Sequence, residues 1–307
     1  MNMGQLKACL VAGFTVLTPC MSHAQSSVPG ASAPPSHPAV TVEGVTYTPA
    51  SILNRNMGTP AEQEEAFTPH RVIGNIYYVG TKKLSSFLVV TSEGNILINT
   101  TYERNVPTIA KSIEKLGFKV SDIRIILGNH AHGDHMEGDA ALKRMTGAEV
   151  VVMGQDVKML EAIKPGGKDH PIDKIIMDGM TVKLGETTLT ARLVAGHTPG
   201  CTAWTTTATE GGKSYDVVFG CSLRSPAVVS PEVEAQLERS LKVWRALPCD
   251  VMLGDHPAQY QMAEKFAKLK PGAPNPFIDK PTCTKEADIQ EAMFRAVLKE
   301  QAAGVKP

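Results

Sequence analysis

The sequence lacks an excess of charge of either sign. Its 307 residues include 31 Lys plus Arg and 31 Asp plus Glu, so the formal net charge is zero. Proteins that bind nucleic acids or anionic membranes usually present a strongly basic surface. We therefore expect a small-molecule partner and no nucleic-acid partner.

Long apolar runs are also missing, apart from a short one over residues 8–17, which the small-x-small sequence SHA follows. A membrane-spanning helix needs about 20 apolar residues. The pattern therefore predicts a secretory signal peptide over residues 1–24, cleaved after Ala24. Lipid attachment at Cys20 is the alternative, but Pro19 stands where lipoprotein signals prefer a small residue. We expect export to the periplasm without a membrane anchor.

Cysteine pairs of the C-x-x-C type are missing as well. The sequence has six cysteines, and cleavage of the signal peptide would remove two of them. Four cysteines in an oxidising compartment predict two disulfides, for which three pairings are possible. The four are Cys201, Cys221, Cys249 and Cys283.

Residues 25–40 are rich in Ser, Ala and Pro, a composition that offers little to bury. We expect a leader over residues 25–66, disordered at least to about residue 40, and one domain over residues 67–307. We expect strands near residues 75–80, 85–90, 95–100, 123–128, 148–153, 181–185, 187–196, 201–208, 215–220 and 250–254. We expect helices near residues 106–117, 138–147, 155–163, 231–247, 258–270 and 284–302. This order predicts an α/β fold in which two sheets pack face to face with helices outside.

Metal-ligand residue types are concentrated in one loop, GNHAHGDHMEG at residues 128–138. The loop follows an expected buried strand and contains His130, His132, Asp134 and His135. A lone loop histidine is usually solvated or structural. Alternate residues of an extended segment point the same way, so we expect His130, His132 and Asp134 to converge and a turn to bring His135 beside them. Neutral imidazoles and a carboxylate suit Zn²⁺.

One loop cannot complete two tetrahedral sites, so a metal centre requires ligands from other loops. His197 and His256 each stand just past an expected strand. Taken alone, His197 would be interpreted as a turn residue beside a Pro-Gly pair. Together with the first loop, these residues supply three ligands for each of two zinc ions.

These residues resemble a known family. Residues 130–135 form the H-x-H-x-D-H signature of the metallo-β-lactamase superfamily, and residues 196–200, GHTPG, are similar to its second metal-binding loop. The resemblance covers roughly residues 67–290. It implies a four-layer αβ/βα sandwich with two zinc ions in the cleft between its halves.

One position separates the branches of this superfamily. Glyoxalase II-like enzymes and lactonases normally have an Asp, bridging both metals, after the strand that follows the GHTPG loop. Here Cys221 and Ser222 stand at that place, so the chain is similar to the subclass B3 β-lactamases. The resemblance implies two ligand sets: His130, His132 and His197 for the first zinc, and Asp134, His135 and His256 for the second.

The same resemblance implies how the cysteines pair. Cys249 and Cys283 are laid out like the disulfide common in this subclass, and Cys201 and Cys221 correspond to a second bridge that some members have. A disulfide that closes a loop of about 20 residues contributes on the order of 3 kcal/mol. A free, metal-bound Cys221 is the alternative, because other lactamase subclasses have a cysteine ligand near this strand.

Three further positions concern the metal loop and the substrate. Asn99 stands where members often carry Asp, so a carboxylate contact near the zinc loop is weakened to an amide contact. Ser222 matches a position that binds the substrate carboxylate. Arg224 stands where a small hydroxyl residue is frequent; it would either pair with that carboxylate or lie along the cleft rim.

The resemblance implies zinc-dependent hydrolysis of the β-lactam amide bond in penicillins, cephalosporins and carbapenems, which confers antibiotic resistance. A metal-bound hydroxide would attack the carbonyl, and Asp134 would orient it. One alternative is another exported hydrolase on this scaffold, such as a lactonase, which a bridging carboxylate would indicate. A non-catalytic zinc protein is the other, and it would have lost ligands that this sequence retains.

Overall fold

Two β-sheets packed face to face form the centre of the fold. The structure, a computed structural model, describes residues 36–305. The signal peptide predicted over residues 1–24 and the first part of the predicted leader lie outside these residues. A seven-stranded sheet has the order β3-β4-β5-β6-β7-β8-β9, and a five-stranded sheet has the order β10-β11-β12-β13-β14.

The strands of the seven-stranded sheet come first along the chain, and those of the five-stranded sheet follow. The first sheet contains β3 (His70–Ile73), β4 (Ile76–Tyr78), β5 (Phe87–Thr91), β6 (Gly94–Ile98), β7 (Ile123–Leu127), β8 (Glu149–Met153) and β9 (Lys174–Ile176). The second contains β10 (Thr181–Leu184), β11 (Thr187–Leu193), β12 (Thr202–Glu210), β13 (Lys213–Gly220) and β14 (Val251–Gly254). The longer helices are α3 (Val106–Lys115), α5 (Asp139–Thr146), α7 (Pro231–Ala246), α8 (Met262–Lys268) and α9 (Lys280–Ala302). Short helices are η1 (Glu103–Asn105), η2 (Val120–Asp122), α4 (Gly133–Met136), η3 (Gly154–Asp156), α6 (Val157–Leu160), η4 (Pro165–Gly167) and η5 (Pro257–Tyr260).

The seven-stranded sheet is apolar on both faces. Strands β6 to β9 pair in parallel, and parallel sheets are stable only where both faces are covered. In β6, Ile96 and Ile98 pack into the core shared with the other sheet, whereas Leu97 packs with Ile109 and Ile113 of α3. Successive residues of one strand thus serve two cores.

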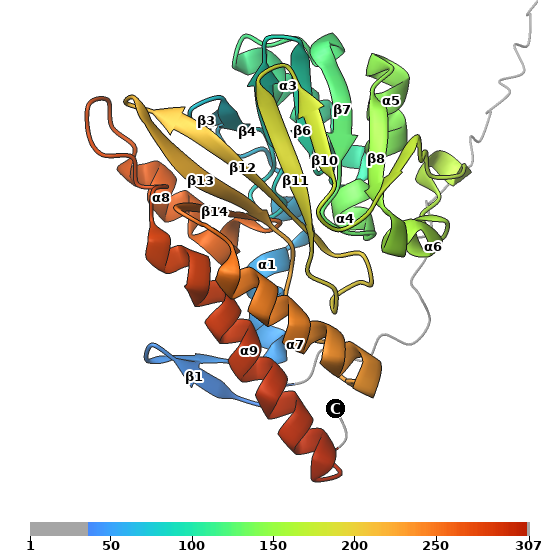
Figure 1. Cartoon of the computed structure of the whole chain (residues 1–307), viewed down its shortest axis with the longest axis vertical. Coiled ribbons are helices and arrows are strands. Elements are labelled where there is room, and N and C mark those ends of the chain that lie inside the picture. The colour runs from blue at the N-terminus through green and yellow to red at the C-terminus, as the bar shows by residue number, and fades with distance from the viewer. Residues whose placement is uncertain (1–35, 306–307) are drawn as a thin grey trace, which may run out of the picture. The chain divides into compact units, whose positions relative to one another are not determined.

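Helices cover the outer face of each sheet. Helix α5 packs on β7 and β8, and α9 packs on β14 and against α7, with α7 and α9 lying side by side in Figure 1. Trp244 of α7 and Phe294 of α9 are buried in the shared core. The four-layer αβ/βα sandwich predicted from the sequence is confirmed.

The described fold extends to Val40, ahead of the boundary predicted at residue 67. Strands β1 (Val40–Val42) and β2 (Val45–Tyr47) form a hairpin against α9, and helices α1 (Pro49–Met57) and α2 (Pro60–Glu64) follow. Arg55 of α1 pairs with Glu286 of α9 at 2.8 Å. Both helices begin with a Thr-Pro pair whose threonine caps the first turn, a helix-start signal that the sequence offered.

No helix within residues 36–305 combines the length and the hydropathy needed to cross a bilayer.

Candidate metal centre

Three loops bring the six predicted ligands together at one edge of the sandwich. Residues 128–138, which we call the first loop, follow β7; His197 lies in the second loop, residues 194–201, after β11; and His256 lies two residues past the end of β14. Each loop leaves a strand of one of the two sheets, so its position is fixed by the packing of those sheets.

The first loop differs from its predicted shape. Asp134 was expected on one extended segment with His130 and His132, with a turn at Gly133 bringing His135 beside them, but residues Gly133–Met136 form the short helix α4. The amide of Met136 donates to the carbonyl of His132 at 3.0 Å. Because the chain turns at His132, Asp134 and His135 come together with His256, while the ring of His135 stays beside that of His130.

One group of ligand atoms comes from the first two loops. The ring centroids of His130, His132 and His197 lie 4.7 to 4.9 Å apart. One ring nitrogen from each lies within 4.8 Å of the other two. This spacing suits three imidazoles around one ion.

A second group lies beside the first. Oδ2 of Asp134 is 3.2 Å from Nε2 of His135 and 3.8 Å from Nε2 of His256. The rings of His130 and His135, one from each group, are only 4.3 Å apart. The six side chains therefore form two adjacent three-ligand sets, with Asp134, His132 and His197 on the partly exposed side.

The donor atoms fit bound metal. Nε2 of His130 and Nδ1 of His135 are buried without a hydrogen-bond partner among the described residues, and unpaired buried polar atoms are costly. Burial and the neighbouring imidazoles hold the pKa of His130 well below its usual value, and burial together with Arg224 does the same for His197. Neutral imidazoles are the form that binds a metal.

Backbone carbonyls orient two of these histidines. Nδ1 of His197 lies 3.3 Å from the carbonyl of Arg224, and Nδ1 of His256 lies 3.1 Å from the carbonyl of Lys83. A carbonyl only accepts, so in each ring Nδ1 carries the proton and Nε2 is left as the ligand atom.

The carboxylate of Asp134 is largely buried and is surrounded by imidazoles. Burial disfavours its ionised form, but the imidazoles of His135, His256 and His132 outweigh that effect and hold the pKa of Asp134 well below its usual range. The carboxylate is therefore ionised at neutral pH and available to a cation.

Two disulfides join the four cysteines. Cys201 is bonded to Cys221 and Cys249 to Cys283, with Cα separations of 5.8 and 6.1 Å. Sγ of Cys221 lies 3.4 Å from Nδ1 of His130. A disulfide sulfur is not a thiolate, so the alternative of Cys221 as a metal ligand does not fit this structure.

The amide of Asn99 acts on the first loop through Asn129. Its Nδ2 donates to Oδ1 of Asn129 at 2.6 Å, and its Oδ1 accepts from the backbone amide of Asn129 at 2.9 Å. Asn129 in turn donates to the carbonyls of Thr202 and Phe219. Asn99 therefore anchors the residue before His130 and contacts no ligand directly.

Glu137, the second acid of the first loop, belongs to neither ligand group. Its Oε2 accepts a hydrogen bond from the backbone amide of Glu103 at 3.1 Å. It ties the first loop to η1.

The two candidate substrate residues lie beside the second loop. Ser222 is buried, and its Oγ accepts from the amide of Arg224 at 3.4 Å. The pKa of Arg224 is lowered by burial, and its guanidinium has no hydrogen-bond partner in residues 36–305. Arginine stays protonated in proteins, so this is an unpaired cation next to the ligand groups.

Asp156 is a buried carboxylate between two of the ligand loops that the sequence pattern did not indicate. Its oxygens accept from the amide of Ala131 at 2.8 Å, from Oγ1 of Thr198 at 2.9 Å and from the amide of Gly200 at 2.6 Å. One side chain thus holds the first and second loops together. A helix was expected over residues 155–163, which hid Asp156; the structure has only a 3₁₀ turn there, followed by one turn of α6.

Asp156→Ala is expected to lower the free energy of unfolding by about 3 kcal/mol, because it leaves buried donors unpaired at 1–3 kcal/mol each. Chemical denaturation of the metal-free protein measures this loss. Asp178→Ala is the matched control: its carboxylate accepts one exposed hydrogen bond, from the amide of Leu193, and its loss should cost below about 1 kcal/mol. Equal losses of stability in the two variants would contradict the role of Asp156 in holding the first and second loops together.

The buried imidazole of His170 contacts the C-terminal end of α4. Nε2 of His170 lies 3.0 Å from the carbonyl of Met136 and 3.3 Å from Oδ2 of Asp139, and its Nδ1 lies 2.9 Å from the carbonyl of Pro171. Burial opposes the charge, but the carboxylate of Asp139 and the two carbonyls outweigh it and raise the pKa of His170.

This raised pKa predicts a pH-dependent contribution to stability. The stability that the protonated imidazole of His170 contributes is fully present below the ordinary histidine pKa of 6.5. It is lost as the pH rises through the higher pKa that His170 has in the folded protein. His170→Gln should therefore lose most stability, relative to the unchanged protein, at mildly acidic pH and less at alkaline pH. Denaturation curves across that pH range measure the difference. A loss of stability in His170→Gln that does not vary with pH would refute a charged imidazole at His170.

The chain was compared with families and known structures. A family described as "Metallo-beta-lactamase superfamily" matches residues 80–212. Among solved structures, the chain is similar to BJP-1, a subclass B3 metallo-beta-lactamase of Bradyrhizobium japonicum, with 36% identity, a TM-score of 0.74, and coverage of 80% of this chain and 98% of that one. It is also similar to FEZ-1 metallo-beta-lactamase from Legionella gormanii, with 37% identity, a TM-score of 0.74, and coverage of 78% and 98%.

Curated relatives are more distant. A hydroxyacylglutathione hydrolase of Cereibacter sphaeroides is 29% identical over 154 residues, which is 48% of this chain and 54% of that protein. The chain spans about half the length of the curated relatives it matches.

Proposed function

The chain belongs to the metallo-beta-lactamase superfamily, in its subclass B3 branch, and from that premise we propose that it hydrolyses the amide bond of β-lactams with two zinc ions. The substrates would be penicillins, cephalosporins and carbapenems, and the outcome for the host would be antibiotic resistance. One observation carries the proposal: two adjacent three-ligand sets, of which the second is built on Asp134, His135 and His256.

The surroundings of Cys221 favour a lactamase over the other hydrolases of this fold. The family resemblance places a bridging carboxylate there in lactonases and glyoxalase II-like enzymes. In this chain Cys221 is bonded to Cys201, so the position can supply neither a carboxylate nor a thiolate ligand. The next residue, Ser222, has its hydroxyl on the side of Arg224.

The chemistry divides between the metals and the chain. Two zinc ions, when bound, would lower the pKa of a water ligand to about 7 and polarise the amide carbonyl. Asp134 would help to hold the second ion and would orient the attacking water by accepting a hydrogen bond from it. Ser222 and Arg224 would hold the substrate carboxylate, so that the scissile bond lies over the two ligand groups.

Turnover assays test this function directly. The zinc-loaded protein should hydrolyse a penicillin, a cephalosporin and a carbapenem, lose activity on dialysis against a chelator, and regain it when zinc is restored. A lactone and a hydroxyacylglutathione thioester serve as comparison substrates. The absence of β-lactam turnover by zinc-replete protein would reject the proposal, and preferential cleavage of either comparison substrate would favour the alternative hydrolase.

Arg224→Ala tests the substrate role of the unpaired cation. A charge-assisted hydrogen bond is worth about 1.5–3 kcal/mol, so KM for a penicillin should rise roughly 10- to 100-fold while kcat changes little. Arg224→Lys keeps the charge and should lose less. An unchanged KM in the alanine variant would leave Arg224 as a residue of the cleft rim.

We also propose that the protein is exported to the periplasm, with its signal peptide removed after Ala24. Two disulfides in the described residues suit an oxidising compartment. The mass of the protein recovered from the periplasm should correspond to a chain that begins at Gln25, whereas retention of residues 1–24 would contradict this processing.

A further inference from the structure

Asp255 is a buried carboxylate at the base of the metal centre. It stands between β14 and His256, and its side chain is completely buried. A cluster of possible ligand atoms includes it with His130 and His135, one histidine from each ligand group. The sequence analysis gave it no role.

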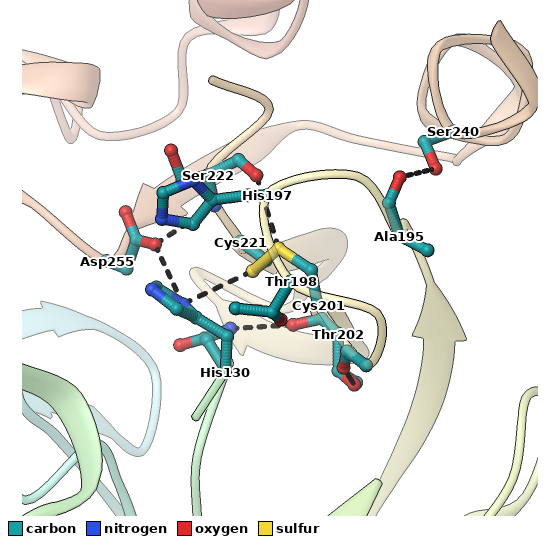
Figure 2. The surroundings of a disulfide bond; sticks show 12 residues. His130, Ala195, His197, Thr198, Cys201, Thr202, Cys221, Ser222, Ser240 and Asp255 are labelled. Atoms are coloured by element: carbon teal, nitrogen blue, oxygen red, sulfur yellow. Dashed lines mark hydrogen bonds and ion pairs between the residues drawn. A yellow bond between two sulfur atoms is a disulfide. The ribbon is translucent and has the colours of Figure 1, made fainter. Parts of the chain in front are cut away.

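One oxygen of this carboxylate contacts two parts of the site. Oδ2 of Asp255 accepts a hydrogen bond from the backbone amide of Ser222 at 3.0 Å, and it lies 3.5 Å from Nδ1 of His130. Figure 2 shows both contacts, with the imidazole of His130 reaching the carboxylate and the Cys201–Cys221 disulfide through the same nitrogen. No Lys or Arg side chain in residues 36–305 lies within 4.0 Å of the carboxylate, which pairs only with His130.

The surroundings of His130 leave one strong acceptor for its proton. A neutral imidazole has one N–H donor and one acceptor nitrogen. The disulfide sulfur at 3.4 Å is a weak acceptor, whereas the carboxylate of Asp255 is a strong one. With the proton on Nδ1, the unpartnered Nε2 of His130 is left as the ligand atom.

We propose that Asp255 is a positioning residue of the metal centre: it orients His130 through Nδ1, and with the same oxygen it holds the backbone of Ser222. The other oriented histidines support this role, because Nδ1 of His197 and of His256 each faces a backbone carbonyl. At His130 the acceptor is a carboxylate, and such an outer partner makes the imidazole a more basic ligand. The inference rests on the proposed function only for the role of Ser222; its metal part stands on the ligand geometry alone.

The test measures metal binding without any substrate. Loss of such an outer partner typically costs 10- to 100-fold in metal affinity. Asp255→Ala should therefore weaken zinc binding at the first site by about 100-fold, and Asp255→Asn, which keeps one acceptor oxygen but no charge, by about 10-fold. Zinc affinity is measured by competition with a chromogenic chelator. The absorption spectrum of the Co²⁺-substituted protein should change in both variants.

Glu286→Gln is the matched control. Glu286 is another buried acid, paired with Arg55 and Gln290 and not with any ligand, so its loss should lower the melting temperature of the metal-free protein and leave zinc affinity and the Co²⁺ spectrum unchanged. Should Asp255→Ala fail to fold, Asp255→Asn decides alone. Wild-type zinc affinity and an unchanged Co²⁺ spectrum in the folded variants would overturn the proposal. Failure of β-lactam turnover would not affect it, since no readout uses a β-lactam.

Discussion

Replacing His197 with alanine is expected to remove zinc from the first site and to lower β-lactam turnover on the order of a thousandfold. The first ligand group would keep only His130 and His132, and two imidazoles do not complete a catalytic zinc site. The reaction would lose both the activated water and the polarised carbonyl, and loss of one polarising donor alone costs about 10²–10³ in kcat.

Metal analysis and kinetics together check this result. Zinc per chain should fall from two to one in His197→Ala, with turnover measured on the same preparation. His70→Ala is the matched control, because His70 is a buried histidine whose ring packs against Tyr78 and Phe266. It should lose stability but keep two zinc ions. Two ions and normal turnover in His197→Ala would remove His197 from the ligand set.

The ligand loops were predictable because strand ends converge. His197 and His256 are separated from the first loop by long stretches of chain, yet each stands just past the end of a strand. In a sandwich of two sheets, loops at the same strand ends meet at one edge. The sequence pattern therefore indicated which histidines would gather, without indicating their geometry.

The shape of the first loop was not predictable from its pattern. Helix α4 has a single turn, which is too short to leave a recognisable helical period. The extended segment expected from the sequence placed Asp134 beside His130 and His132. The helical turn instead places it with His135 and His256. A difference of one turn decides which group of possible ligand atoms a residue joins.

Asp156 and Asp255 were not predictable for a different reason. Asp156 was expected inside a helix over residues 155–163, and Asp255 is a single acid after a strand, a position where acids are usually solvated. Their roles depend on backbone amides from distant segments: Ala131 and Gly200 for Asp156, and Ser222 for Asp255. Only the packed structure brings those amides to a carboxylate. The start of the fold was different, since the Thr-Pro pairs of α1 and α2 could have been recognised.

Asp134→Asn is expected to lower kcat by about 10²–10⁴-fold, the range for loss of a positioned proton-transfer group. The side-chain amide of the variant carries no negative charge beside His135 and His256, and it accepts hydrogen bonds through its single oxygen only. Binding of the second zinc should weaken at the same time, because that ligand set has just one anionic member. Measured zinc per chain should fall toward one at limiting metal, and excess zinc should restore occupancy before it restores rate.

Glu137→Gln separates this effect from a general disturbance of the first loop. Glu137 stands three residues after Asp134, but its carboxylate contacts the amide of Glu103 and neither ligand group. The glutamine variant should keep two zinc ions and near-normal turnover. If Asp134→Asn also kept normal turnover at full zinc occupancy, Asp134 would be a ligand without a part in orienting water. If both variants lost activity equally, the loss would belong to the loop as a whole and not to the carboxylate of Asp134.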